Sequence, residues 1–317
     1  MQTKKLDKVT PTPKWQSNSS ISHYDYIRWY FRQDIKFLML PYLQNREFAL
    51  LVPPHLDYDE RTTRFFKVNN VQNFDRVFDL VNIKRKQTFY NLYSSVATYF
   101  NGLPFIKFGH SERKPAIESW MKKHQHQMSS YDFFIDIDAK PDTFKYAKDS
   151  ALLLVNFFKL INFPFILRFS GTGFHFITPF EYFEEFAFIK NNQSFFRQKD
   201  YFNVYRLMHD LAETLHNKYT ELIDLCIYDS QRLVKIPYSL AIYEGRIEVC
   251  RPINHIDDLE NLELGRSIYP FLAKDKGYYR DHSEVLHNAG GKVSNLLHHE
   301  RHNPVIKEWI NRLDKRK

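Results

Sequence analysis

Two carboxylates in the run Phe133–Asp138 have the type and the spacing for metal chemistry. The run reads FFIDID, and successive side chains of a strand point to opposite faces. Asp136 and Asp138 would then project from one face about 7 Å apart, while Ile135 and Ile137 enter the core. Two such carboxylates can share Mg²⁺ or Mn²⁺ through oxygen ligands. The alternative interpretation is the solvated edge of a half-buried strand, because an isolated DxD is common.

A glycine-containing turn lies between two apolar runs further along the chain, in FILRFSGTGFHFITPF. Gly171 and Gly173 allow positive φ and a close approach of the backbone to a ligand. The backbone N–H groups of such a turn, with the Ser170 hydroxyl and the His175 imidazole, can bind phosphate oxygens. An ordinary β-hairpin with a packed histidine is the alternative.

A third group of charged residues follows in IYDSQRLVKIPYSLAIY. Asp229 is an acid among apolar neighbours and can complete a metal site. Lys235 can neutralise the charge of a triphosphate. Taken alone, the segment is a charged strand and loop with no specific meaning.

In this order, hhhDhD (h is apolar), SGxGxH and a lone aspartate before RLxKxPxSL resemble the three catalytic motifs of the archaeo-eukaryotic primase superfamily. The small catalytic subunit of replicative primases is the most similar group. REFAL (Arg46–Leu50) and YSSVATY (Tyr93–Tyr99) resemble segments that precede the first motif in that group. The likeness runs from about Arg46 to Ile253, which is roughly two thirds of the chain.

The resemblance implies a DNA primase or primase-polymerase, which synthesises primers on single-stranded DNA by template-dependent nucleotidyl transfer from NTP or dNTP. It implies two Mg²⁺ or Mn²⁺ ions on three ligands: Asp136, Asp138 and Asp229. The implied phosphate contacts are Ser170, Gly171, Thr172, Gly173, His175 and Lys235, with Arg46 and Arg232 as weaker candidates. A primase large subunit or a replicative helicase is the implied protein partner.

The chain departs from the family pattern at several positions. Thr172 stands where many relatives carry a basic residue, and the turn is one residue shorter. Ala241 stands where many carry a histidine, so contacts on the triphosphate side are expected to differ. Cys226 and Cys250 cannot form the zinc knuckle of many relatives, and we expect no structural zinc.

Three other functions fit part of this pattern. An accessory subunit that binds nucleic acid and has lost synthesis is consistent with Thr172 and Ala241. A metal-dependent nuclease or a glycosyltransferase would also use a DxD pair. A glycosyltransferase would be expected to carry a sugar-nucleotide domain ahead of the DxD pair, and it would leave the SGxGxH turn unexplained.

Composition is that of an ordinary globular protein; its positive charge suits a polyanionic partner, and a solvated basic surface is the alternative interpretation. The 317 residues are 43% hydrophobic and 26% charged, with a formal net charge of +8. No apolar run reaches the roughly 18 residues of a membrane span. The first residues are polar, so we expect a cytoplasmic or nucleoid-associated protein that is not secreted. The basic residues Lys84, Arg85, Lys86, Arg113, Lys114, Lys122 and Lys123, with Trp120 among them, are candidates for contacts to single-stranded DNA.

The elements that position these residues predict an α+β fold: one primase-type catalytic domain at 23–317, with a mixed β-sheet, packed helices and a C-terminal helical segment. Residues 1–22 are predicted to form a flexible arm. Helices are predicted at His23–Gln44 (ended or bent by Pro41), Val71–Ile83, Asp142–Leu160, Tyr182–Lys190, Tyr201–Glu221 and Pro304–Arg316. Strands are predicted at Glu47–Val52, Thr63–Val68, Phe133–Asp138, Phe165–Phe169 and Phe174–Thr178, with β-rich segments at Phe89–Tyr99 and Ile227–Pro252.

Overall fold

A computed structural model describes residues 22–53, 62–66, 68, 70–83, 88–99, 107–108, 119, 128–183, 201–228, 232–243, 246–264 and 284–314. Several predictions fall outside these ranges: the arm before Ser22, the basic residues at 84–86, 113–114 and 122–123, Asp229, and most of the helix predicted at Tyr182–Lys190. Within the described part, helices and strands both occur and confirm the α+β class.

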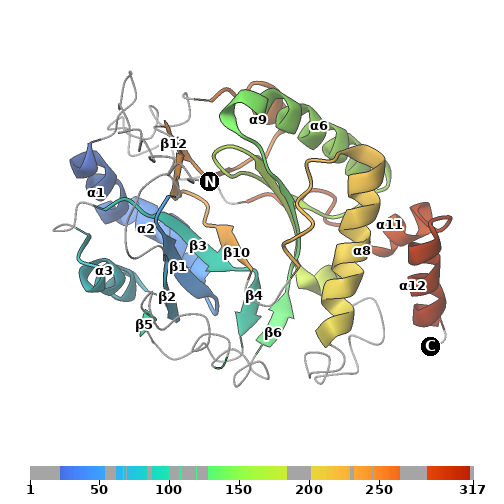
Figure 1. The fold of residues 1–317 in the computed structure, drawn as a ribbon, viewed down its shortest axis with the longest axis horizontal. Coiled ribbons are helices and arrows are strands. Elements are labelled where there is room, and N and C mark those ends of the chain that lie inside the picture. Colours follow the sequence, from blue (N-terminus) through green and yellow to red (C-terminus); the bar gives the residue numbers. More distant parts are fainter. Residues whose placement is uncertain are drawn as a thin grey trace, which may run out of the picture.

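The first layer of the fold is a five-stranded antiparallel sheet with strand order β10-β3-β1-β2-β5. Three helices cover its outer face, on the left in Figure 1. Their buried side chains and the apolar residues of β1 and β3 form one hydrophobic core. The strands are β1 (Glu47–Leu51), β2 (Thr62–Phe66), β3 (Asn91–Ser95), β5 (Lys107–Phe108) and β10 (Leu233–Lys235), and the helices are α1 (His23–Phe31), α2 (Gln33–Met39) and α3 (Val71–Leu80).

The single helix predicted at His23–Gln44 is wrong, because the chain forms two helices and a short 3-10 turn, η1 (Leu40–Leu43). The interruption lies at Arg32, whose backbone is extended (φ −67°, ψ 130°). The Arg32 guanidinium pairs with Asp34 at 2.5 Å just beyond the break. Separating the helices lets α1 bury its own aromatic face against the first sheet, with Trp29 and Tyr30 almost wholly inaccessible.

The second layer is a four-stranded sheet with the order β13-β8-β9-β7. Alternate residues of β7, among them Ile135 and Ile137, enter a second hydrophobic core under α6 and α8, as the strand pattern predicts. The strands are β7 (Phe133–Ile137), β8 (Ile166–Phe169), β9 (Phe174–Thr178) and β13 (Arg251–Pro252). The helices on this side are η3 (Pro141–Thr143), α6 (Phe144–Leu160), η4 (Phe180–Phe183), α8 (Tyr201–Tyr219), α9 (Ile256–Glu260), α11 (Ser294–His299) and α12 (Pro304–Asp314).

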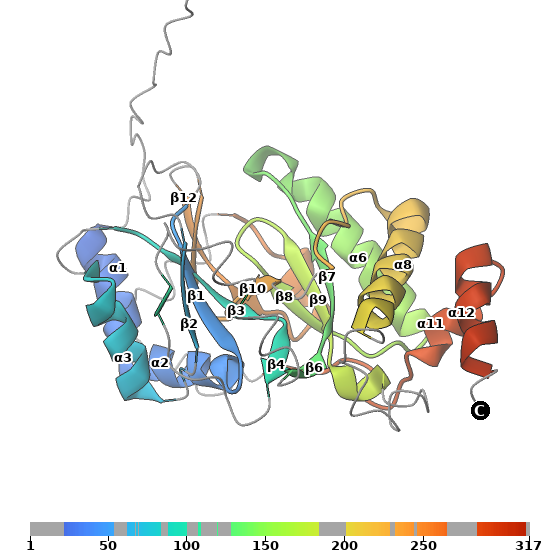
Figure 2. The same cartoon turned by 60° about the horizontal axis from the view of Figure 1, so that its bottom comes forward.

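The two sheets lie between the two sets of helices (Figure 2), so their inner faces look toward each other. Two short ribbons join the layers: β4 (Ala97–Tyr99) with β6 (Met128–Tyr131), and β11 (Leu240–Tyr243) with β12 (Arg246–Val249). Polar residues of both sheets line the space between them. In the part of the chain that the structure describes, no helix is long and apolar enough to cross a bilayer.

Candidate active site

A row of polar side chains crosses the inner face of the second sheet. The strand register places Arg168 of β8 opposite His175 of β9, and His175 opposite Asp136 of β7. Side chains directly opposite each other in an antiparallel pair have Cβ atoms about 5 Å apart. The His175 Nε2 lies 3.5 Å from Oδ1 of Asp136. The DxD strand therefore stands beside the histidine of the SGTGFH motif.

Asp224 extends this row on the other side of β7. An isolated antiparallel bridge pairs Ile137 with Ile223. The Asp138 N–H donates to the Leu222 carbonyl at 3.1 Å, and the Asp224 N–H donates to the Asp136 carbonyl at 2.9 Å. These backbone bonds set Asp224 opposite Asp136, as His175 is on the other side.

Three carboxylates converge at the end of β7. One oxygen from each of Asp136, Asp138 and Asp224 lies within 4.8 Å of the others. Asp136 is buried, Asp224 is half-buried and Asp138 is exposed. Arg232 partly balances them, since its Nη2 donates to Asp136 at 3.3 Å and to Asp224 at 3.4 Å.

The electrostatics of this cluster favour an added positive charge. Burial, followed by the neighbouring Asp138, raises the pKa of Asp136 above its usual range. Partial desolvation and Asp224 also raise the pKa of the Asp138 carboxyl. Among the described residues, no group hydrogen-bonds to the buried Oδ1 of Asp136. An all-oxygen cluster with an unpaired buried oxygen fits a hard divalent cation such as Mg²⁺ or Mn²⁺.

The SGTG turn joins β8 to β9 beside the carboxylates. Ser170 closes it twice: its N–H donates to the Gly173 carbonyl at 2.9 Å, and its hydroxyl accepts from the Gly173 N–H at 3.1 Å. Gly171 has φ +109°, which side-chain-bearing residues rarely adopt. A Cβ on Gly173 would lie 2.0 Å from the Ile137 carbonyl oxygen. Gly171 is therefore needed for the backbone conformation of the turn, and Gly173 for its close contact with β7.

Lys235 reaches this turn from the opposite sheet. It belongs to β10, which pairs with β3 in the first layer. The Lys235 Nζ donates to the Ser170 carbonyl at 3.0 Å. The cation is thereby fixed next to the turn, at the place where phosphate oxygens would meet it.

His175 is neutral in this setting. Burial, reinforced by the positive charges of Lys235 and Arg168, holds the pKa of His175 well below its usual range. Its ring meets the Phe134 ring edge-on, with centroids 4.9 Å apart. Within the described residues its Nδ1 has no hydrogen-bond partner. A neutral imidazole can donate one hydrogen bond to a ligand without adding charge.

These side chains line a cavity of about 490 Å³ between the sheets. Its volume lies in the usual range for small-molecule sites. Its described charged residues are the cations Arg64, Arg232 and Lys235 and the acids Asp136 and Asp138. The carboxylate oxygens, together with Lys235 beside the turn, suit a ligand that carries a metal-bound polyphosphate.

Most of the residues predicted from the motifs are brought together here. Asp136, Asp138, Ser170, His175, Arg232 and Lys235 all line the cavity, and Gly171, Thr172 and Gly173 form the adjoining turn. Asp229, predicted as the third ligand, lies outside the described residues. The structure places Asp224 in the carboxylate cluster, a residue that the sequence reasoning missed. Its signal was present in LIDLC, an acid flanked by apolar residues five positions before Asp229.

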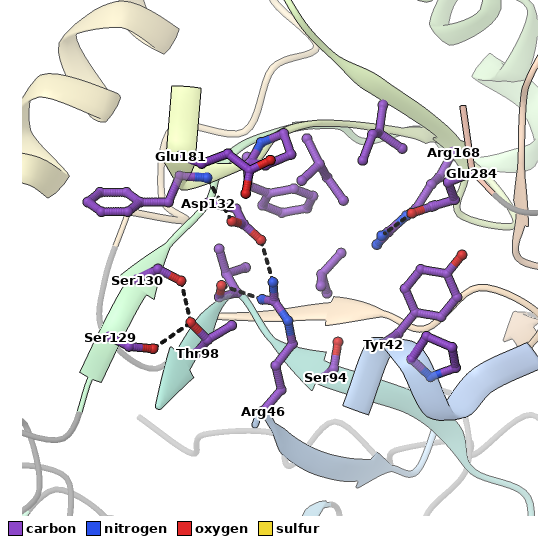
Figure 3. A pocket seen from close by; sticks show the side chains of 18 residues that line it. Tyr42, Arg46, Ser94, Thr98, Ser129, Ser130, Asp132, Arg168, Glu181 and Glu284 are labelled. Atoms are coloured by element: carbon purple, nitrogen blue, oxygen red, sulfur yellow. Dashed lines mark hydrogen bonds and ion pairs between the residues drawn. The ribbon is translucent and has the colours of Figure 1, made fainter. Parts of the chain in front are cut away.

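Arg46 lies in a second cavity, on the same face of the second sheet as the carboxylate cluster (Figure 3). Its Nη2 pairs with Asp132 at 2.5 Å, and its Nη1 donates to the Ser95 and Val96 carbonyls. Its guanidinium therefore already has a carboxylate partner, and it lies outside the cavity that contains the carboxylate cluster.

Comparison with known proteins adds only a distant structural similarity. No protein-family model matches the chain, and no curated protein matches its sequence. Among solved structures, the polymerase domain from Mycobacterium tuberculosis Ligase D in complex with DNA is similar at 11% identity and a TM-score of 0.43. The match covers 79% of this chain and 87% of that one. Similarity at this level establishes neither a family nor an activity.

Proposed function

We propose that the chain is a metal-dependent nucleotidyltransferase of the archaeo-eukaryotic primase type, which extends or initiates a nucleic-acid strand on a single-stranded template. The observation that carries the proposal is the convergence of Asp136, Asp138 and Asp224 beside the SGTG turn. A carboxylate triad alone is compatible with many hydrolases. A triad next to a turn and a lysine that can hold phosphates fits phosphoryl transfer, which relies on positioning and charge neutralisation.

The three aspartates would hold the cation or cations. Held there, a divalent ion would supply the charge that lowers the pKa of an attacking 3′-hydroxyl and that stabilises a pyrophosphate leaving group. Phosphoryl transfer requires positioning and charge neutralisation more than covalent catalysis, which accords with a site built from acids, a lysine and backbone amides.

The turn and Lys235 would orient the triphosphate of an NTP or dNTP. The turn presents backbone amides at glycines, where no side chain blocks the approach of an anion. The neutral His175 would donate a hydrogen bond to a phosphate oxygen next to Asp136. Arg232 would balance the carboxylates before substrate arrives and contact phosphate afterwards.

The template, the protein partner and the residues that contact the template are proposed from the sequence. Single-stranded DNA is the proposed template, in keeping with the net charge of +8. A large subunit or a helicase is the proposed protein partner. The basic residues at 84–86, 113–114 and 122–123 are the proposed template contacts.

The test is a primer-synthesis assay with single-stranded template, labelled NTP or dNTP, and Mg²⁺ or Mn²⁺, with and without an initiating oligonucleotide. Wild type should give product whose sequence depends on the template. Asp136→Ala and Asp138→Ala should abolish synthesis and leave template binding largely intact. Asp142→Ala, which removes an exposed aspartate just beyond β7, is the matched control and should be as active as wild type.

The same assay separates the alternatives. An accessory subunit would bind template and make no product. A nuclease would shorten the template, and a glycosyltransferase would do neither. Near-normal extension by Asp136→Ala would refute the metal assignment.

A further inference from the structure

The second cavity, of about 400 Å³, adjoins the reactive row and is open to a ligand of nucleoside size (Figure 3). Its floor is a cross-strand row of apolar side chains, in which Ile177 of β9 lies opposite both Phe134 and Ile166. This row is one strand repeat, about 7 Å, from the row that contains Asp136 and His175. The two cavities are thus neighbours on one sheet face.

Two ion pairs close the ends of this cavity. Arg46 pairs with Asp132, which also accepts from the Phe180 N–H at 3.1 Å. Arg168 pairs with Glu284 through two hydrogen bonds, one of them at 2.8 Å. The Arg168 and Glu284 side chains are each 8% exposed, so their positions are fixed by the fold.

The charge of the cavity argues against a phosphate ligand. Among its described lining residues, two arginines face three carboxylates, those of Asp132, Glu181 and Glu284. Both arginines are already neutralised by hydrogen-bonded partners. The metal-side cavity differs in having a cation, Lys235, whose Nζ donates to a backbone carbonyl rather than to a carboxylate. An anion therefore has a cation to bind on the metal side, whereas here it would meet a lining with an excess of carboxylates.

The remaining surface suits an uncharged ligand with polar edges. Thr98 hydrogen-bonds to Ser129 at 2.9 Å and also to Ser130, which places three hydroxyls on one wall. Tyr42 lies against Arg168, whose guanidinium carbon is 5.0 Å from the ring centroid. A hydrophobic floor with fixed donors and acceptors at its rim is complementary to a nucleobase and its sugar.

We propose that this second cavity binds the nucleoside part of a nucleotide, base and sugar, and leaves the phosphate outside. The choice of a nucleoside rests on the proposed function, and the site itself rests on the cavity. The nucleoside has two possible sources: an unpaired base of the template, or the initiating nucleotide that carries the 3′-hydroxyl.

The experiment measures binding calorimetrically without divalent metal, so that catalysis plays no part. Free nucleosides, inorganic phosphate, and a short single-stranded DNA with or without one abasic residue are titrated into the full chain. Ile166→Trp and Ser130→Trp fill the cavity from its floor and its wall. Leu160→Trp, at a 79% exposed position of α6, is the matched control.

Wild type and Leu160→Trp should bind nucleosides, and both filled variants should bind them about tenfold or more weakly. If the template supplies the base, wild type will prefer the intact over the abasic DNA, and the filled variants will lose that preference. If the initiating nucleotide supplies it, nucleosides will compete only with one another and the two DNAs will bind alike. Equal nucleoside binding by wild type and filled variants, or competition by inorganic phosphate, would overturn the proposal.

A gain of binding tests the charge argument even if the tryptophan variants do not fold. Asp132→Asn leaves Arg46 without its carboxylate, so inorganic phosphate should gain affinity for this cavity. No gain in a folded Asp132→Asn protein would overturn the proposal. Mn²⁺ titration of wild type reports separately on the carboxylate site, so a failure of the proposed function is distinguishable from a failure here.

Discussion

At the scale of single residues, the site depends on what limits the electrostatic repulsion between its three carboxylates. Arg232 lies close to two of them, and its hydrogen bonds of 3.3 and 3.4 Å are long. Bonds of that length are weak and readily exchanged. The arginine therefore limits repulsion between the acids and can still give way to a cation.

If Asp224 is the third metal ligand, the substitutions of Asp224 and of Asp229 should affect Mn²⁺ binding differently. Asp224→Ala should weaken Mn²⁺ binding by about tenfold or more, because a direct ligand should cost at least as much as an outer-shell group. Asp229→Ala should bind Mn²⁺ as wild type does. Calorimetric titration of Mn²⁺ measures both variants, and normal binding by Asp224→Ala would return the assignment to Asp229.

Glu47 should make stability depend on pH. Burial raises the pKa of Glu47 to about 6, and Arg64 only partly opposes this. The folded pKa exceeds the unfolded value of about 4.5. The contribution of Glu47 to the free energy of unfolding is therefore fully present below pH 4.5 and is lost as the pH rises through 6. The loss is about 2 kcal/mol at roughly 1.4 kcal/mol per pKa unit.

Glu47→Gln removes this titration. The unfolding free energy of the variant, minus that of wild type, should therefore rise by about 2 kcal/mol between pH 4 and pH 7. Urea denaturation at each pH measures the difference. A difference that stays constant with pH would contradict the assignment of Glu47 as a buried acid.

Residue types and spacing were sufficient to predict the DxD pair, the turn and Lys235, since each lies within one short segment. For Asp224, LIDLC shows an acid among apolar residues, but its place beside Asp136 depends on the pairing of Ile223 with Ile137, which no local pattern encodes. The place of Arg46 was not predictable for the same reason. Its partner Asp132 is 86 residues away in sequence.

At the scale of elements, the turn between β8 and β9 is the most constrained part of the site. It contacts β7 through Gly173 and contacts β11 through Gly171, where an added Cβ would lie 2.2 Å from that of Ala241. A larger side chain at position 241 would meet the turn. Ala241 thus accompanies a closely packed turn.

Gly173→Ala should destabilise the protein by about 1–3 kcal/mol, because the new methyl group meets a backbone carbonyl that cannot rotate away. Gly290→Ala is the matched control: nothing lies within 4 Å of its added Cβ. That variant should stay within about 0.5 kcal/mol of wild type. Thermal or chemical denaturation compares them, and equal stability of the two variants would contradict the packing described here.

Strands and most helices were predictable within a few residues, because their apolar periodicity is strong. The predicted strand Glu47–Val52 is β1 (Glu47–Leu51), and the predicted helix Pro304–Arg316 is α12 (Pro304–Asp314). The break at Arg32 was not predictable, since the residues around it continue the helical pattern. The break is explained by the burial of α1 against the first sheet, which is a tertiary contact.

At the scale of the whole molecule, the net charge of +8 predicts salt-dependent binding to single-stranded DNA. The logarithm of the binding constant should fall linearly with the logarithm of salt concentration, because bound phosphates release counterions. Fluorescence anisotropy over a salt series measures the slope. Asp136→Ala should give the same slope as wild type, and binding that does not change with salt would contradict an electrostatic template contact.

The assignment of β10 to the first sheet has a consequence for synthesis on the ribosome. The Trp29 indole donates to the Tyr238 carbonyl, 209 residues further along the chain, and the Tyr30 hydroxyl accepts from the Leu240 N–H. A nascent chain that has emerged only as far as β9 therefore holds α1 and β3 without the strands that complete their core. Contacts so distant in sequence form slowly. The core of the first sheet is therefore completed only after β7, β8 and β9 of the second sheet have been synthesised, and Lys235 reaches the turn in that late step.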